Sequence, residues 1–306
     1  MEYVLKTNSL CKHYKHFKAL SGLTMNVPKG AIYGFVGRNG AGKTTLIRLV
    51  CGLQFATEGS FELNGIKNTD RNIDKARRKM GAVVETPSLF PEMTARENLM
   101  HQFRLLGLPS YDDVGELLKL VGLADTGKKK VKDFSLGMRQ RLGIAVALCG
   151  DPDLLILDEP INGLDPQGIV EVRELILKLN RERKITVIIS SHILGELSKL
   201  CTDYGFIDRG TLLKEITSDQ LETDCTEYLK LCVSDTEKAK KVLRSLGIAG
   251  VTDGDSGEIR IVGSKVGSDD ITEAMVLNKI RVYEISRQGT DLEGYYLEMI
   301  GNGKES

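Results

Sequence analysis

One stretch of nine residues decides the fold: Gly37-Arg38-Asn39-Gly40-Ala41-Gly42-Lys43-Thr44-Thr45. It matches the phosphate-binding pattern G-x-x-x-x-G-K-[ST]. The apolar run 32–36 before it predicts a buried strand, and the apolar residues at 45–50 after it predict a helix. A strand, a glycine-rich loop and a helix in this order predict a loop whose backbone N–H groups surround phosphate oxygens.

The residue types in this loop suit a nucleoside triphosphate with a divalent cation. Glycines allow the backbone to approach an anion closely. Lys43 is expected to reach the β- and γ-phosphates, and the Thr44 hydroxyl is expected to coordinate Mg²⁺. The other residues expected to contact the nucleotide here are Gly37, Arg38, Asn39, Gly40, Ala41, Gly42 and Thr45. An accidental glycine-rich turn would explain neither the lysine nor the flanking strand and helix.

Two carboxylates follow a second predicted buried strand. Residues 154–157 are all Leu or Ile, and Asp158-Glu159-Pro160 come directly after them. Asp158 is expected to hold Mg²⁺, either through water or through the Thr44 hydroxyl. Glu159 is then placed to orient or deprotonate a water that attacks the γ-phosphate. The competing interpretation, a strand followed by solvated acidic residues, is weakened by the phosphate-binding loop.

Composition excludes several functional classes. The 306 residues include 42 basic and 42 acidic side chains, so no global positive field favours nucleic acid as a partner. Apolar runs fall short of the roughly 18–20 residues that span a bilayer. The start Met1-Glu2-Tyr3 has no basic and apolar leader, so no signal peptide is expected. The six cysteines form no C-x-x-C pair, and the four histidines are too dispersed for a metal cluster.

Strand-like and helix-like patterns alternate along the first part of the chain, which predicts an α/β fold with a parallel sheet. The predicted strands are 32–36, 81–84, 154–157, 186–189 and 204–207, and the clearest helices are 140–149 and 170–180. Leu and Met at helical spacing predict a helical block at about 95–123. The polar stretch 217–224 predicts a linker, and the remainder predicts a small, acidic α+β domain with 17 acidic and 11 basic residues from Ser218 onward.

Three further motifs make the chain resemble the ATP-binding subunit of an ABC transporter. Residues 134–141 are similar to the family signature L-S-G-G-Q followed by Q-R, residues 162–166 match the D-loop, and His192 matches the switch histidine. The resemblance implies that Ser135, Gly137 and Met138 bind the ATP held by a second copy of the chain. It also implies that His192 senses the γ-phosphate. Ser135 is expected to begin a helix whose N-terminus binds an anion.

The resemblance also implies a role for Tyr14, which occupies the position of the aromatic residue that stacks on adenine. Packing of Tyr14 in the core is the alternative, and stacking tolerates other bases, so use of GTP stays open. Leu136 and Met138 depart from the signature, and Glu85 stands where the family has a glutamine. A carboxylate at this position is a candidate Mg²⁺ ligand that would also repel phosphate. Glu85 and the altered signature resemble the branch of the family that exports bacitracin and lantibiotics.

The resemblance implies a P-loop NTPase fold of the ABC type. Its domain at 1–217 should contain a parallel core, an antiparallel β subdomain and a helical subdomain at about 86–150, followed by an accessory domain at 218–306. It further implies a head-to-tail homodimer, a separate polytopic permease that docks near 85–104, ATP and Mg²⁺ as cofactors, and a peripheral position on the inner face of the cell membrane.

The expected function is ATP hydrolysis that powers export of a peptide antibiotic or drug. A soluble ABC ATPase acting on ribosomes or DNA is the alternative. It is disfavoured because such relatives usually carry two nucleotide domains or a long coiled-coil insertion, neither of which is present in this sequence. A non-hydrolysing ATP sensor would not need Glu159 and His192.

Overall fold

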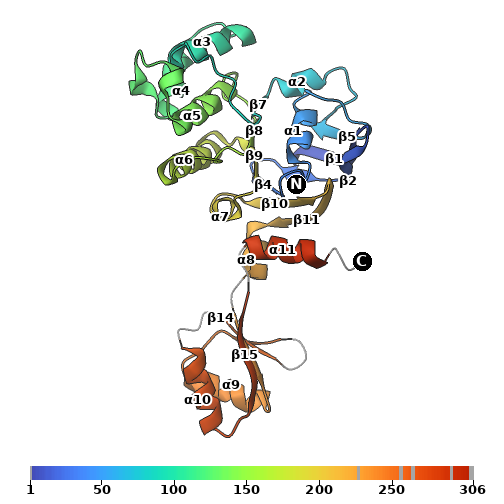
Figure 1. Ribbon diagram of the computed structural model, residues 1–306, viewed down its shortest axis with the longest axis vertical. Coiled ribbons are helices and arrows are strands. Elements are labelled where there is room, and N and C mark those ends of the chain that lie inside the picture. The colour runs from blue at the N-terminus through green and yellow to red at the C-terminus, as the bar shows by residue number, and fades with distance from the viewer. Residues whose placement is uncertain (1, 226–227, 255–257, 263–265, 290–291, 303–306) are drawn as a thin grey trace. The chain divides into compact units, whose positions relative to one another are not determined.

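A six-stranded sheet forms the centre of the first of two units, Met1–Ser218 and Asp219–Ser306 (Figure 1). The computed structural model describes residues 2–225, 228–254, 258–262, 266–289 and 292–302. The strand order is β11-β10-β4-β9-β8-β7, and all neighbours are parallel except β10 and β11. The strands are β4 (Ile32–Val36), β7 (Met80–Val83), β8 (Leu154–Asp158), β9 (Thr186–Ser191), β10 (Asp203–Asp208) and β11 (Thr211–Thr217).

The two faces of this sheet are covered by different layers. Every residue of β4 and β8 is buried, as expected for parallel strands covered on both sides. On one side lies helix α1 (Lys43–Val50), which contacts both β8 and an antiparallel sheet. That second sheet contains β1 (Tyr3–Tyr14), β2 (Phe17–Leu23), β3 (Asn26–Pro28), β5 (Glu58–Leu63) and β6 (Ile66–Lys67). The short helix α2 (Ile73–Arg77) contacts β5, β6 and β7.

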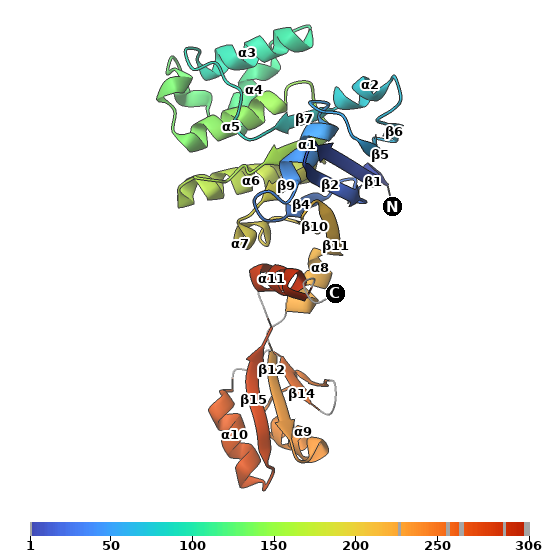
Figure 2. The same cartoon turned by 45° about the vertical axis from the view of Figure 1, so that its right-hand side comes forward.

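Longer helices lie on the other side of the parallel sheet, as both views show (Figure 2). They are α3 (Ala95–Leu106), α4 (Asp113–Leu120), α5 (Leu136–Ala147) and α6 (Pro166–Arg183), and the short helix α7 (Leu194–Leu197) follows β9. Thr94 and Glu97 form a capping box at the start of α3, and Gly107 ends it with φ 66°. The predicted combination of a parallel core, an antiparallel sheet and a helical subdomain is confirmed.

The second unit has the chain order β-α-β-β-α-β of the split β-α-β arrangement. Its elements are β12 (Tyr228–Val233), α9 (Thr236–Ser245), β13 (Val251–Asp253), β14 (Ile259–Val262), α10 (Ser268–Leu277) and β15 (Val282–Gln288). The antiparallel sheet has the order β13-β14-β12-β15. Alternate residues of β12, including Leu229 and Leu231, share one core with both helices, so α9 and α10 cover the same face. Helix α11 (Leu292–Asn302) follows, with Tyr296 buried.

The sequence left some elements unpredicted. The polar stretch 217–224 contains most of helix α8 (Ser218–Cys225), with Leu221 as its buried residue, and the boundary between the two units falls inside the stretch, after Ser218. A single apolar anchor leaves too weak a periodic pattern to predict a helix. Strands β5, β6 and β11 were not predicted either, since their residues are half-exposed and largely polar. Within the described part of the chain, none of the helices has both the length and the hydrophobicity that a bilayer crossing requires.

Gly81 in β7 provides a test of the packing between the parallel sheet and α5. A Cβ atom at this position would lie 2.1 Å from the carbonyl oxygen of Ala147, which belongs to the helix backbone. We expect Gly81→Ala to destabilise the protein by about 1–3 kcal/mol, because the helix must shift. The measurement is urea unfolding of the full chain.

Gly115→Ala is the matched control, since this glycine lies inside α4 with no atom near its missing Cβ. We expect this variant to be more stable by about 0.5–1 kcal/mol. Equal unfolding midpoints for the two variants would contradict the close contact between β7 and α5.

Candidate nucleotide site

The glycine-rich loop leaves the carboxyl end of β4 and enters α1 at Lys43. Gly42 precedes the helix with φ 112°, and a Cβ atom there would lie 2.6 Å from the carbonyl oxygen of Ala19. A larger residue therefore meets both an unfavourable backbone conformation and a steric clash. This tight turn aims the free N–H groups at the start of α1 into one cavity of about 250 Å³.

Lys43 is buried at the base of this cavity, with 6% of its surface exposed. Its ammonium group donates to the carbonyl oxygen of Gly37 at 2.5 Å and lies 3.5 Å from a carboxylate oxygen of Glu159. A buried ammonium group needs such partners, because desolvation of an unpaired charge is costly. The same contacts hold a positive charge next to the N–H groups of the loop.

Asp158, at the end of β8, is held from two sides. The Thr44 hydroxyl donates to one carboxylate oxygen at 2.8 Å, and the hydroxyl of Ser190, at the end region of β9, donates to the other. Asp158 is 1% exposed and Ser190 is fully buried. Carboxylate and hydroxyl oxygens are hard donors that suit Mg²⁺, so Thr44 and Asp158 together fit this ion.

Glu159 has a backbone conformation that is rare for a residue with a side chain, with φ 52°. Its N–H donates to the backbone oxygen of Ser190 at 3.0 Å and to the Ser190 hydroxyl at 3.2 Å. Its side chain lies 2.8 Å from Nδ1 of His192. Two predicted residues of the site, Glu159 and His192, are therefore brought together. Ser190 holds the carboxylate of Asp158 and the backbone N–H of Glu159.

An aromatic residue that the sequence analysis did not select lines the cavity. Phe17 begins β2, is 58% exposed and lies beside Ala19 and the loop residues Arg38, Asn39 and Gly40. Tyr14 pairs with Phe17 across the β1–β2 turn, but its hydroxyl donates to Gln54 at 2.6 Å and it is not among the lining residues. An exposed aromatic residue at a hairpin end, close to a phosphate-binding loop, is the signal that could have identified Phe17.

Residues of the signature motif do not line this cavity. Ser135 caps α5, where its hydroxyl accepts a hydrogen bond from the N–H of Met138 at 3.2 Å. Its predicted position at a helix start is confirmed. Ser135 is exposed, and Gly137 has space around its Cα, so this helix end presents free N–H groups at the surface.

Glu85, two residues beyond the end of β7, also has a positive φ of 59°. Its carboxylate contacts the guanidinium of Arg48 at 2.6 Å. Both side chains line a groove of about 420 Å³, which also includes Leu53, Gln102 and Val146. The described residues contain no group of three or more His, Cys, Asp or Glu that could hold a metal ion, so Thr44 and Asp158 remain a two-residue set.

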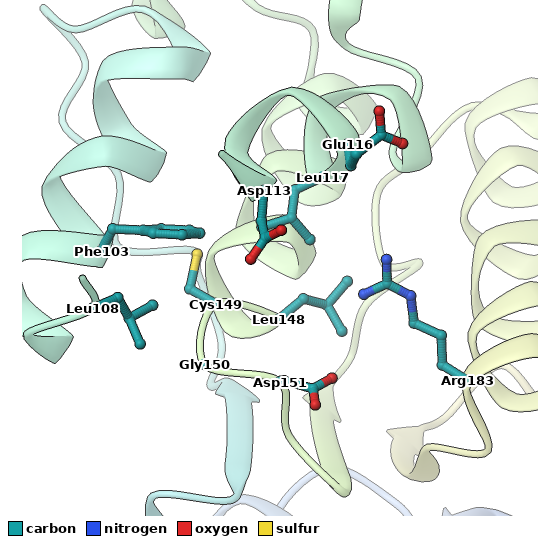
Figure 3. Close-up of a pocket in the computed structure, with 10 residues that line it drawn as sticks. All are labelled: Phe103, Leu108, Asp113, Glu116, Leu117, Leu148, Cys149, Gly150, Asp151 and Arg183. Carbon is teal, nitrogen blue, oxygen red and sulfur yellow. The ribbon is translucent and has the colours of Figure 1, made fainter. Parts of the chain in front are cut away.

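The larger cavity of about 480 Å³ lies in the helical subdomain and contains none of the motif residues (Figure 3). Phe103, Leu108 and Leu148 form its apolar side, and the side chains of Asp151 and Arg183 border it. Burial raises the pKa of the Cys149 thiol in this cavity to about 12. Size alone does not make it the nucleotide site, because it lacks a phosphate-binding loop.

Known proteins with similar sequences and structures are named as ATP-binding proteins. The ABC transporter family profile matches residues 20–162. The bacitracin transport ATP-binding protein BcrA of Bacillus licheniformis is 42% identical over 99% of both chains. The lantibiotic transport ATP-binding protein SrtF of Streptococcus pyogenes is 42% identical over 72% of this chain and 93% of its own. A solved dimer of the ATP-binding cassette MJ0796 with ADP and Pi has 26% identity and a TM-score of 0.63, covering 70% of this chain and 98% of that one.

The chain belongs to the family of ABC transporter ATP-binding proteins. The 42% identity to BcrA over 99% of both chains establishes family membership, because the family profile by itself covers less than half of the chain. The prediction of an ABC-type P-loop fold is confirmed. The chain binds and hydrolyses ATP, and the predicted class of enzyme, an ATPase, is confirmed.

Ser190 is expected to affect turnover more than nucleotide binding, because it touches Asp158 and Glu159 but does not line the cavity. We predict that Ser190→Ala lowers kcat or Mg²⁺ affinity roughly 10- to 100-fold, as for other residues that orient metal ligands. ATPase assays over a range of Mg²⁺ concentrations measure this.

Thr186→Val is the control, because it removes a buried hydroxyl from the other end of the same strand, where it bonds the N–H of Gly30. Its activity should stay close to that of the wild type. Full activity of Ser190→Ala would contradict a supporting role for Ser190.

Proposed function

We propose that this chain is the ATP-hydrolysing subunit of a transporter that exports a peptide antibiotic through a separate membrane subunit. The observation that carries the proposal is the similarity to BcrA along almost the whole chain, supported by the similarity to SrtF. The names of both relatives link them to antibiotic transport. These relatives favour transport over the alternative of a soluble ABC ATPase on ribosomes or DNA.

Within one chain, we assign roles to the residues around the cavity. Lys43 and the loop residues 37–45 bind the phosphates, while Thr44 and Asp158 hold Mg²⁺, which neutralises phosphate charge when it is bound. Glu159 orients or deprotonates the attacking water, and His192, 2.8 Å from Glu159, senses the γ-phosphate. Tyr14 and Phe17, paired at the β1–β2 turn, provide aromatic surface for the base.

The active assembly in this proposal is a head-to-tail homodimer. Ser135 is exposed and Gly137 and Met138 are partly exposed at this helix end, so this part of the chain can meet the phosphates held by a second copy. The dimeric form of the similar cassette MJ0796 supports this arrangement. ATP between the two copies stabilises the closed dimer, and its hydrolysis removes that stabilisation.

A permease helix docks in the groove that contains Glu85 and Gln102, two residues of the predicted docking region 85–104. Exposed Leu53 and half-buried Leu89 add apolar surface beside the charged pair Arg48 and Glu85. Through this contact the chain is held at the inner face of the cell membrane. The unit Asp219–Ser306 is an accessory domain of the same subunit.

Glu159→Gln tests the catalytic assignment. The amide keeps the size of the side chain but cannot accept a proton, so we expect ATPase activity to fall roughly 100-fold or more while ATP still binds. Light scattering should show an ATP-dependent dimer of this variant that persists. Glu182→Gln, at an exposed position of α6, is the control and should hydrolyse ATP normally. Unchanged hydrolysis by Glu159→Gln would exclude Glu159 as the base.

Affinity capture of tagged Glu159→Gln from gently solubilised native membranes tests the transport assignment. We expect a polytopic membrane protein in stoichiometric amount, identified by mass spectrometry. Adding Ser88→Arg to the groove should remove this partner without loss of ATP binding, since Ser88 is exposed and lies away from the phosphate-binding loop. Ribosomal proteins in place of a membrane protein would overturn the proposal.

A further inference from the structure

Glu85 is a carboxylate in the groove that also contains Arg48, whose helix α1 begins at the phosphate-binding loop. The family resemblance leads one to expect a neutral glutamine at this position, whereas a carboxylate repels the triphosphate of ATP. The backbone restricts the options of this residue, because Glu85 has φ 59° and the loop packs through Pro87 against Gly143. A Cβ atom on Gly143 would lie 2.6 Å from Pro87, so the loop has little space to move toward the helix.

Arg48 is placed to compensate the negative charge of Glu85. It contacts the Glu85 carboxylate at 2.6 Å, with 37% and 59% of the two side chains exposed. Arg48 comes four residues after Thr44 on α1, so the two side chains lie on the same face of one helix. Four residues correspond to about 6 Å along the helix axis. The ion pair therefore lies about one helical turn from the hydroxyl proposed to hold Mg²⁺.

We propose that Arg48 is a positioning residue for Glu85, which keeps the carboxylate in the groove and compensates its charge so that ATP binds with Mg²⁺ nearby. This inference rests on the proposed roles of Thr44 and Asp158. The contact is exposed, so it contributes little to folding stability and can open when another cation approaches Glu85. The main effect of the ion pair is on the electrostatic potential at the phosphates of bound ATP.

The proposal requires that the effects of the two residues depend on each other. Without Arg48, the Glu85 carboxylate is uncompensated and lowers the affinity for the anionic nucleotide. Without Glu85, Arg48 has no carboxylate to compensate, and the site resembles the ordinary family site with glutamine. Removing both charges should therefore restore affinity, which a purely structural role of Arg48 would not allow.

The experiment measures equilibrium binding of ATP with Mg²⁺ to the full chain by titration calorimetry. We expect Arg48→Met to bind roughly fourfold more weakly, Glu85→Gln to bind at least as tightly as the wild type because Arg48 is then an unpaired cation, and the double variant to recover wild-type affinity. Arg48→Lys should keep most of the affinity because it keeps the charge. The loss in Arg48→Met should shrink at about 1 M salt, where the screening length is about 3 Å.

Lys119→Met is the matched control, because it removes one partner of an exposed ion pair, that with Glu116 on α4. It should bind ATP normally, and thermal unfolding should show that each variant is folded. Equally weak binding by Arg48→Met and by the double variant would overturn the inference, as would normal binding by Arg48→Met. If Mg²⁺ does not strengthen ATP binding to the wild type, the proposed Mg²⁺ site fails instead.

Discussion

The carboxylate of Asp158 is the constraint on which the site depends. It is buried at the end of β8 and accepts hydrogen bonds from Thr44 at the start of α1 and from Ser190 near the end of β9. An ionised carboxylate at this depth requires such donors. Because all the strands except β11 are parallel, their carboxyl ends meet at one edge of the sheet, and the three elements can share this group. The hydrogen bond from Thr44 ties the phosphate-binding loop to Asp158, and Glu159 follows Asp158 directly in the chain.

The two acidic residues beside this centre, Glu85 and Glu159, both have left-handed backbone conformations. Such conformations cost about 1–3 kcal/mol and persist only where the surroundings hold them. For Glu159 the holding contacts are the hydrogen bonds from its N–H to Ser190. For Glu85 the holding contact is the packing of Pro87, in the same loop, against Gly143. Left-handed backbone thus occurs at the residue to which we assign hydrolysis and at one that lines the proposed docking groove.

Much of the first unit could be predicted because its signals are local. The run 154–157 is apolar throughout, and β8 is buried at every position. The phosphate-binding motif predicted the turn into α1, where Gly42 has the φ of 112° that glycine allows. Helix α8 could not be predicted, because Leu221 is its one buried residue and the residues around it show no helical period of apolar side chains. Strand β11 was missed although it pairs with β10, its neighbour in the chain, because most of its residues are exposed and its apolar residues do not alternate with polar ones.

The sequence by itself determined the family, the ATPase chemistry and the loop that surrounds the phosphates, because these depend on the spacing of a few residue types within short segments. Only the tertiary structure decided which charge compensates Glu85 and which aromatic residue lines the cavity. Arg48 and Glu85 are 37 residues apart and meet because α1 packs on β8 and the neighbouring strand in the sheet is β7. Phe17 reaches the cavity because the β1–β2 turn places it beside the loop, and both Tyr14 and Phe17 lie at that turn, so the sequence alone does not distinguish between them.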